Sequence, residues 1–178
     1  MPDPARHPHL LVVIPVYQAR DCLAELYRRL TQALEPLTPD FEIVLVEDGD
    51  DDGSWEAIAT LAGNDSRVKG ISLSRKFGHH FAITDGLDHV VGDWVVVMDC
   101  DLQDQPEEIG KLYRKAQEGY DIVFARRQER QDSFYRRWSS AFIAALYNHL
   151  GDSHLDNSVA NFSISSRRAI AYVCQFRE

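Results

Sequence analysis

The sequence has few cysteines and no long apolar run. Cys22, Cys100 and Cys174 are the three cysteines of the 178 residues, and no pair has the C-x-x-C spacing. An odd number of unpaired cysteines disfavours a disulfide scaffold or a zinc site and fits a reducing cytoplasm. No apolar run approaches the roughly 18 residues that a membrane helix needs. The first nine residues lack the apolar core of a signal peptide, so we expect residues 1–9 to form a frayed leader.

Two nucleotide-binding motifs are also missing. No G-x-G-x-x-G follows the first apolar segment, which disfavours a dinucleotide-binding site. No G-x-x-x-x-G-K-[ST] occurs anywhere, which removes the P-loop interpretation. A ligand site on this chain would therefore rely on carboxylates and a metal ion.

The net charge of −9 is unevenly distributed. The first 120 residues carry 11 basic and 22 acidic groups, whereas the remaining residues carry 8 arginines against 6 acidic groups. The acidic front half disfavours nucleic acid as a partner, although a metal ion can neutralise clustered carboxylates. The arginine-rich back half suits an anionic ligand such as a phosphate.

Apolar segments alternate with amphipathic ones along the whole chain. Continuous apolar runs predict strands buried on both faces, and 3.6-residue periodicity predicts helices. We expect strands over 10–17, 41–49, 68–74, 93–99, 121–127 and 161–166, and helices over 21–37, 54–63, 79–92, 106–119, 134–151 and 167–176. This order predicts an α/β domain covering 1–178, with a Rossmann-like, mostly parallel central sheet flanked by helices.

Acidic residues follow the predicted strands where ligands bind in such sheets, beyond the carboxyl ends. Asp99 and Asp101 follow the fourth strand, and their spacing of two would place both carboxylates on one face of an extended chain. Carboxylate oxygens suit Mg²⁺ or Mn²⁺, and Gln103 would add a carbonyl oxygen. An isolated D-x-D is more often a solvated turn before a helix, but two further acidic or polar strand ends favour a metal site here.

These segments resemble the successive motifs of family 2 inverting glycosyltransferases, which have the GT-A fold. The matching stretches are VVIPVYQ, EIVLVEDGDDDGS and LSRKFGHHFAITDGLDHVVGDWVVVMDCDLQDQPEEI, and the resemblance extends from about Leu10 to about Arg168. The subgroup it most resembles is that of dolichyl-phosphate mannose synthase and the bactoprenol glucosyltransferases.

The resemblance implies roles for individual residues. Pro15 and Tyr17 would line the pocket for the nucleotide base, and Asp48 would hydrogen-bond the base, with Glu47 beside it. Asp99 would contact the ribose or the metal, and Asp101 would ligate the metal, with Gln103 as a helper. Arginines that would face the donor or acceptor phosphates are Arg126, Arg127, Arg136 and Arg137.

Several of these residues also have a purely structural interpretation. Tyr17 is as well explained as a core aromatic, and Asp50, Asp51 and Asp52 are better explained as turn residues than as ligands. Adjacent histidines, His79 and His80, invite a metal interpretation, but neighbouring side chains point apart and no third ligand is evident. A structural role or a wall of the donor pocket is favoured for them. The arginine pairs 136–137 and 167–168 also fit charge on a helix surface.

The chain departs from the family pattern at Asn161, which stands where the subgroup has an aspartate that is a candidate base. Ser163 stands in the place of the following arginine. Asn cannot accept a proton, and Asp156 is a nearby substitute. A sugar hydroxyl needs a base to become nucleophilic, whereas a phosphomonoester is already largely anionic at neutral pH. Asn161 therefore fits a phosphate acceptor better than a hydroxyl acceptor.

The sequence thus predicts an inverting, metal-dependent glycosyltransferase that uses a nucleotide-diphospho-sugar, with UDP-sugars favoured over GDP-sugars. The preferred acceptor is a polyprenyl phosphate at the cytoplasmic face of the membrane. Residues 138–150 are amphipathic enough for peripheral membrane association, but packing on the sheet is the favoured role for them. Alternatives are transfer to a saccharide of a cell-surface glycan and a non-catalytic nucleotide-sugar-binding protein. A nucleotidyltransferase is disfavoured, since no glycine-rich loop follows the first strand. Subgroup members often continue into membrane helices, so a membrane region beyond residue 178 is an open expectation.

Overall fold

The computed structural model describes residues 9–89, 92–126 and 159–173. Within these residues six strands form one sheet in the order β3-β2-β1-β4-β6-β5. The strands are β1 (Leu10–Val16), β2 (Phe41–Glu47), β3 (Val68–Ser72), β4 (Trp94–Val97), β5 (Ile122–Arg126) and β6 (Val159–Ser166). β1 to β4 are mutually parallel, and β6 runs antiparallel to both β4 and β5. The predicted mostly parallel sheet is confirmed.

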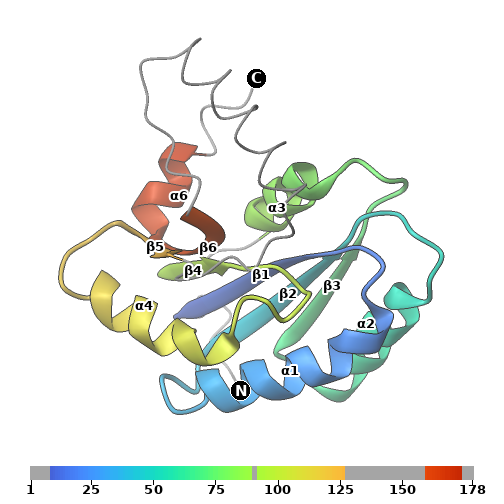
Figure 1. Ribbon diagram of the computed structural model, residues 1–178, viewed down its shortest axis with the longest axis horizontal. Coiled ribbons are helices and arrows are strands. Elements are labelled where there is room, and N and C mark those ends of the chain that lie inside the picture. Colours follow the sequence, from blue (N-terminus) through green and yellow to red (C-terminus); the bar gives the residue numbers. More distant parts are fainter. Residues whose placement is uncertain (1–8, 90–91, 127–158, 174–178) are drawn as a thin grey trace, which may run out of the picture.

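Helices cover both faces of this sheet (Figure 1). They are α1 (Arg20–Leu34), α2 (Ser54–Asn64), α3 (His79–Asp88), α4 (Ile109–Ala116), preceded by the short 3₁₀ helix η1 (Pro106–Glu108), and α6 (Arg167–Val173). In Figure 1 α1, α2 and α4 lie on one side of the sheet, and α3 and α6 lie on the other. This is the three-layer arrangement that a parallel sheet needs to bury both faces.

The alternation of β1 explains the two layers. Leu10, Val12 and Ile14 belong to the core beneath α1, α2 and α4, whereas Leu11 and Val13 belong to the core beneath α3 and α6. Successive side chains of a strand point to opposite faces, and every residue of β1 is buried. A continuous apolar run is therefore the pattern that this central strand requires.

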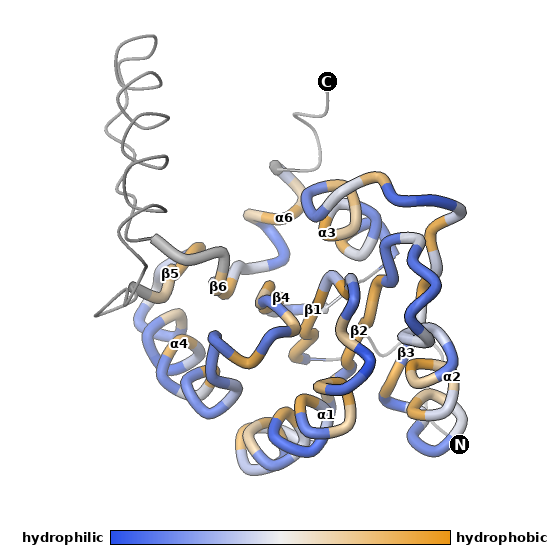
Figure 2. The backbone as a smooth tube through the Cα atoms, turned by 45° about the vertical axis from the view of Figure 1, so that its right-hand side comes forward, coloured by the Kyte–Doolittle hydropathy of each residue, from blue (hydrophilic) through white to orange (hydrophobic). Residues whose placement is uncertain are grey.

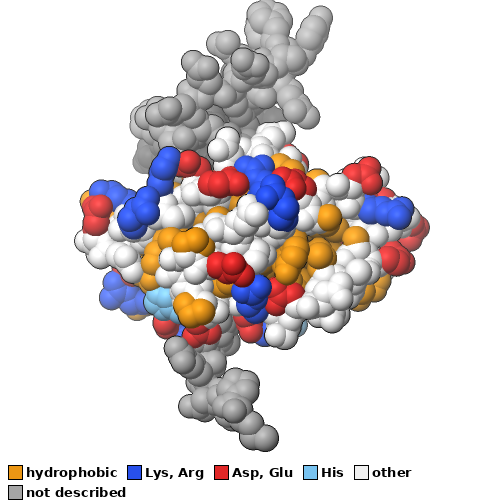
Figure 3. Space-filling view, turned by 90° about the horizontal axis from the view of Figure 1, so that it is seen from below, with side chains coloured by type: hydrophobic (Ala, Val, Ile, Leu, Met, Phe, Trp, Pro, Cys, Tyr) orange, Lys and Arg blue, Asp and Glu red, His pale blue; other side chains and the backbone are white. Residues whose placement is uncertain are grey.

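The amphipathic helices bury one stripe each. In α1 the buried residues are Leu23, Leu26, Leu30 and Leu34, at the spacing of one helix face. Figure 2 shows the same alternation of hydrophilic and hydrophobic colours along α1 and α4. On their outer surface acidic and basic side chains lie side by side (Figure 3), as in the pairs Arg28–Glu25 and Arg29–Glu107. Side chains of both charge signs are therefore interspersed on this face.

The element bounds differ from the predicted ones mainly at the ends. The strands predicted over 41–49 and 93–99 end earlier, at Glu47 and Val97. The segment predicted as one helix over 106–119 begins as η1 and continues as α4 to Ala116. Gly119 follows with a φ of 106°, a conformation that glycine adopts without strain. The helix predicted over 134–151 lies outside the described residues.

Among the residues that the structure describes, no helix is long and apolar enough to cross a membrane.

Candidate functional site

The carboxyl ends of three adjacent parallel strands meet at one edge of the sheet. In the order β2-β1-β4, β1 ends at Val16 in register with Glu47, and β4 ends at Val97. Asp48 directly follows the end of β2, and Asp99 lies two residues after the end of β4. Because β6 is antiparallel, it begins at this same edge, where Asn161 lies two residues before the residue paired with Val97. The edge thus gathers the acidic motifs that the sequence singled out.

The D-x-D segment lies in a turn, since β4 has already ended two residues before Asp99. Leu102 has a left-handed φ of 61°, and the Gln103 N–H donates to Oδ1 of Asp101 over 3.0 Å. The Asp99 N–H donates to Oδ2 of the buried Asp104 over 3.2 Å. The prediction that an extended strand carries Asp99 and Asp101 was therefore wrong, since β4 has already ended and local hydrogen bonds hold this segment.

Asp99 is contacted from the opposite side by helix α3. The imidazole Nε2 of His79, the first residue of α3, lies 3.4 Å from Oδ1 of Asp99. The side chains are 39% and 25% exposed, respectively, but the Asp99 oxygen that faces His79 is itself buried. The structure therefore places His79 beside Asp99. The sequence analysis favoured a structural role or a wall of the donor pocket for this residue, and the role in the donor pocket stays a prediction.

Glu47 and Asp48 are both buried and already hold hydrogen bonds. Glu47 accepts from the Asp50 N–H at 2.6 Å and from the Ser72 hydroxyl at 2.7 Å. Asp48 accepts from the backbone N–H groups of Phe77, at 2.7 Å, and Gly78, at 2.9 Å. In this conformation both carboxylates bind the loops after β2 and β3, and contact of Asp48 with a base stays a prediction.

Tyr17 lies at the surface, 39% exposed, and is not the core aromatic that the alternative interpretation required. The Lys76 ammonium lies 3.6 Å from the centre of its ring, a cation–π distance.

Pro15 is buried inside β1. The Val13 carbonyl points toward β4 and accepts a hydrogen bond from the Met98 N–H, just beyond the last β1–β4 pair. Backbone groups two residues apart on a strand point to the same neighbour, so the Pro15 nitrogen also points toward the β4 side, past the end of the pairing. Proline therefore costs this central strand no ladder hydrogen bond.

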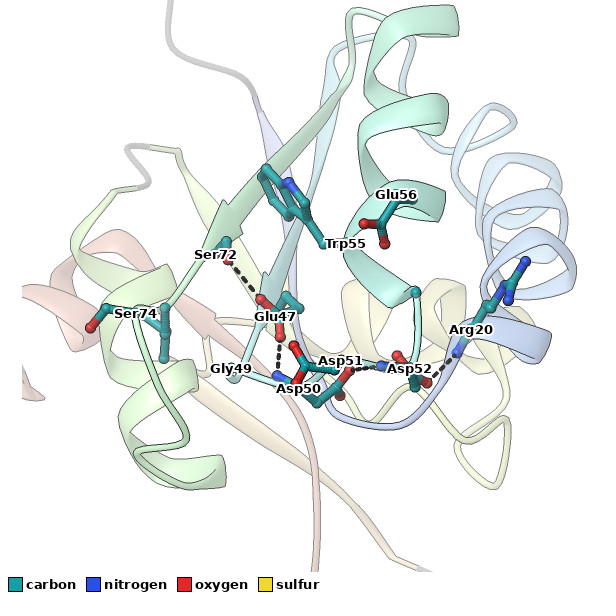
Figure 4. A pocket seen from close by; sticks show the side chains of 12 residues that line it. Arg20, Glu47, Gly49, Asp50, Asp51, Asp52, Trp55, Glu56, Ser72 and Ser74 are labelled. Atoms are coloured by element: carbon teal, nitrogen blue, oxygen red, sulfur yellow. Dashed lines mark hydrogen bonds between the residues drawn. The ribbon is translucent and has the colours of Figure 1, made fainter.

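A hollow of about 520 Å³ opens beside Glu47, between the loop after β2, the start of α2 and the end of β3 (Figure 4). Its lining includes the Trp55 side chain, Arg20, Ser72 and the three aspartates 50–52. Asp50 accepts from the Gln18 and Asp52 N–H groups, and Asp52 accepts from the Ser54 and Arg20 N–H groups. The structure confirms the turn role expected for Asp50 and Asp52.

The two aspartates of this loop have unlike acidities. Burial, with the neighbouring Asp52, raises the pKa of Asp50. Burial acts in the same direction on Asp52, but hydrogen bonds from Asp50, Ser54 and Arg20 outweigh it and lower the pKa of Asp52 to about 2. Asp52 also links this loop to the start of α1, through its hydrogen bond from the Arg20 N–H.

The protein atoms alone provide an incomplete set of metal ligands. In the described segments no three His, Cys, Asp or Glu side chains are grouped closely enough to hold an ion. Asp101 is exposed and Asp99 is partly exposed at the sheet edge. Mg²⁺ is commonly bound by one or two carboxylates together with substrate phosphates. The pair Asp99 and Asp101 fits a cation of this kind only if a phosphate-bearing ligand completes the shell.

The remaining predicted residues are only partly described. Arg127, Arg136, Arg137 and Asp156 lie outside the described residues. Arg126 and Asn161 are placed by their backbones, in β5 and β6 respectively. Gln103 is exposed in the D-x-D turn, next to Asp101. For these residues the predicted roles stay predictions. Arg168, in contrast, pairs with Asp121 and fits the helix-surface interpretation.

Solved structures with the same fold are glycosyltransferases. A mannosyltransferase from Pyrobaculum calidifontis, in complex with GDP-Man and Mn²⁺, is 17% identical with a TM-score of 0.65, and the match covers 97% of this chain and 48% of that chain. Mannosyl-3-phosphoglycerate synthase from Rubrobacter xylanophilus is 19% identical with a TM-score of 0.68, covering 91% and 54%.

A third similar structure is glucosyl-3-phosphoglycerate synthase from Mycobacterium tuberculosis, in complex with Mn²⁺, UDP and phosphoglyceric acid. It is 18% identical with a TM-score of 0.64, and the match covers 90% of this chain and 56% of that chain. The chain thus spans about half the length of these solved structures. At these identities the likeness is one of fold, and it confirms the predicted GT-A fold.

The sequence profile of the family described as Glycosyl transferase family 2 matches residues 11–171, nearly the whole chain. That range contains every strand end described above. The chain belongs to glycosyl transferase family 2.

Proposed function

We propose that this protein transfers a sugar from a nucleotide-diphospho-sugar to a polyprenyl phosphate, with inversion at the anomeric carbon. The observation that carries the proposal is the meeting of Asp48, Asp99 and Asp101 at one sheet edge of a family 2 chain. Such an edge is where ligands of open α/β sheets bind. The acceptor phosphate oxygen would attack the anomeric carbon while the nucleoside diphosphate leaves.

Mg²⁺ or Mn²⁺ would be held by Asp99 and Asp101, with Gln103 adjacent. The bound cation would supply positive charge against the charge that develops on the leaving diphosphate. Similar structures with GDP-Man, UDP and Mn²⁺ support this donor class. Tyr17 offers an exposed ring for the base, with Pro15 and Glu47 nearby, and we favour a UDP-sugar over a GDP-sugar.

The acceptor assignment rests on chemistry at the start of β6. Asn161, at the edge where β4 ends, cannot act as a general base. A phosphate acceptor needs none, because its second pKa is about 6 and it is already largely anionic at neutral pH. Arg126, at the end of β5, with Arg127, Arg136 and Arg137 would screen the phosphate charge. With this acceptor, the transfer reaction would take place at the cytoplasmic face of a membrane.

A thermal-shift panel tests the donor half of the proposal. The protein is heated with UDP, GDP and their sugar conjugates, each with and without Mn²⁺. We expect stabilisation by one nucleotide series that depends on Mn²⁺. Asp101→Ala should abolish that shift, whereas Asp51→Ala, an exposed acid of the same edge, should keep it. No shift with any nucleotide, or an unchanged shift in Asp101→Ala, would contradict the proposal.

The acceptor half of the proposal is tested by extracting the labelled lipid product into an organic solvent. The protein is incubated with a labelled donor, Mn²⁺ and a short-chain polyprenyl phosphate in detergent, and label in the organic phase is measured. We expect label in that phase with the phosphate and none with the matching polyprenol. Donor binding without any transfer would instead favour the non-catalytic nucleotide-sugar-binding protein.

A further inference from the structure

The chain between β4 and η1 is closed on itself by the side chain of Asp104. Oδ2 of Asp104 accepts a hydrogen bond from the Asp99 N–H over 3.2 Å, and the residue is 3% exposed. An acid just before a helix is usually an N-terminal cap, but among the described residues no side chain caps η1, whose N-cap residue is Gln105. The Asp104 carboxylate is therefore directed back to the D-x-D turn.

The residues just after Asp104 are anchored in the protein. Pro106, the first residue of η1, is buried, and Ile109, at the start of α4, is 0% exposed in the core shared with α1. The Arg29 guanidinium on α1 donates to both carboxylate oxygens of Glu107, at 2.8 and 2.6 Å. Packing and an ion pair therefore hold the backbone from which the Asp104 side chain extends.

The contact acts on the backbone of a predicted metal ligand. Beyond β4 the Met98 N–H still donates to the Val13 carbonyl of β1, at 3.3 Å, and the next N–H along the chain is that of Asp99. Asp104 accepts from this group where the pairing with β1 has ended. Because the Asp99 side chain extends from this backbone, a fixed backbone limits the positions that its carboxylate can take.

We propose that Asp104 is a positioning residue for the predicted cation site: its carboxylate oxygen fixes the backbone at Asp99, so that Asp99 and Asp101 can bind Mg²⁺ or Mn²⁺ together with the donor diphosphate. This inference rests on the proposed function. Groups that orient metal ligands in this way typically contribute about 10- to 100-fold to metal affinity or activity. The role depends on where the Asp104 oxygen lies, and not on its negative charge.

Three substitutions separate the position of this oxygen from its charge. Asp104→Asn keeps an oxygen at the same distance from the backbone and removes the charge. Asp104→Glu keeps the charge and moves the carboxylate outward by one methylene group. Asp104→Ala removes both. Asp65→Asn is the matched control for lost stability, because Asp65 precedes β3 at the opposite edge of the sheet and accepts from the Arg67 guanidinium and the Tyr27 hydroxyl.

Titration calorimetry on the intact chain follows UDP, and separately GDP, with Mn²⁺ and with EDTA, and thermal unfolding records the stability of each variant. We expect Asp104→Ala and Asp104→Glu to weaken the Mn²⁺-dependent binding by about 10-fold or more. Asp104→Asn should recover most of the affinity, because its amide oxygen can accept from the same N–H. Asp65→Asn should bind like the wild type although its melting temperature is lower.

Three outcomes would each overturn the inference. They are an equal loss in Asp104→Asn and Asp104→Ala, wild-type binding by Asp104→Glu, and a loss in Asp65→Asn as large as that in Asp104→Ala. If Asp104→Ala does not fold, the comparison of Asp104→Asn with Asp104→Glu decides in the same way. A wild-type chain that binds neither nucleotide with Mn²⁺ would overturn the proposed function itself, so the two failures are distinguishable.

Discussion

The carboxylate of Asp48 accepts a hydrogen bond from the Gly78 N–H over 2.9 Å. This contact joins the end of β2 to the residue before α3, thirty positions further along the chain. Because α3 packs on β1 and β2, the contact also sets the height of the helix over the sheet edge. A residue predicted to bind a nucleotide base thus has a structural role in the site as it stands.

Replacing Asp48 by alanine should destabilise the fold. Two backbone N–H groups would lose their acceptor at a position that is 3% exposed, and a buried donor left without a partner costs about 1–3 kcal/mol. Urea unfolding measures this loss. The exposed Asp51→Ala should stay near the wild-type midpoint, and an Asp48→Ala midpoint equal to it would contradict the assigned contact.

Replacement by alanine should change the stability of the protein in opposite directions at two glycines in helices, Gly86 and Gly63. In α3 a Cβ at Gly86 would lie 2.5 Å from Cγ1 of Val13 and 3.0 Å from Cγ2 of Val46, so Gly86→Ala should cost about 1–3 kcal/mol by overpacking. In α2 nothing lies within 4 Å of a Cβ at Gly63, and Gly63→Ala should stabilise by up to about 1 kcal/mol through helix propensity. Thermal unfolding of both variants measures the difference, and a shift of the same sign in both would refute it.

The sheet and its acidic edge could be predicted because their causes are local in sequence. The run Leu10–Val16 is apolar throughout, which a strand buried on both faces requires. The stripe of Leu23, Leu26, Leu30 and Leu34 carries the period of a helix against that sheet. Since parallel strands present their carboxyl ends together, the acids after β2 and β4 had to lie at one edge.

The orientation of individual side chains at that edge could not be predicted, because turns decide it. Because β4 ends at Val97, Asp99 and Asp101 lie in a turn where strand alternation does not set their orientation. The contact between His79 and Asp99 joins residues twenty positions apart, and it depends on where the loop after β3 is anchored. No periodicity in the sequence indicates where this loop is held, because Asp48 binds it through backbone N–H groups, which every residue but proline has.

The pair formed by Asp65 and Arg67 should make stability depend on acidic pH. Hydrogen bonds from the Arg67 guanidinium, at 2.8 Å, and from the Tyr27 hydroxyl hold the pKa of the Asp65 carboxyl far below its ordinary value. A lowered pKa in the folded state stabilises the protein above the unfolded pKa, and the contribution is lost as the pH falls. Asp65→Asn should therefore cost about 1–2 kcal/mol near neutral pH.

The difference between the wild type and Asp65→Asn should shrink as the pH falls below about 4. Urea unfolding across acidic to neutral pH measures it, with Asp51→Asn as an exposed control. A difference that is constant over the whole range would show that Asp65 acts by shape alone.

The thiol between the two aspartates of the D-x-D turn should react slowly. Burial raises the pKa of Cys100 to about 11, from an ordinary value of 9.0. Burial, with Asp101, Asp21 and Asp52, also raises the pKa of Cys22, whose thiol donates to the Cys100 carbonyl over 3.2 Å. Because the thiolate is the nucleophile, alkylation of Cys100 by iodoacetamide near pH 8 should be about 100-fold slower than that of a free thiol.

Peptide-level mass spectrometry follows each cysteine separately, and the urea-unfolded chain provides the reference rate. For native Cys100 the rate should rise about tenfold per pH unit up to about pH 10, as the thiolate fraction grows. Equal rates in the native and unfolded chains would contradict the raised pKa. A neutral thiol at this position matters for the site, because it leaves the negative charge of the turn on the carboxylates of Asp99 and Asp101, where a hard cation prefers to bind.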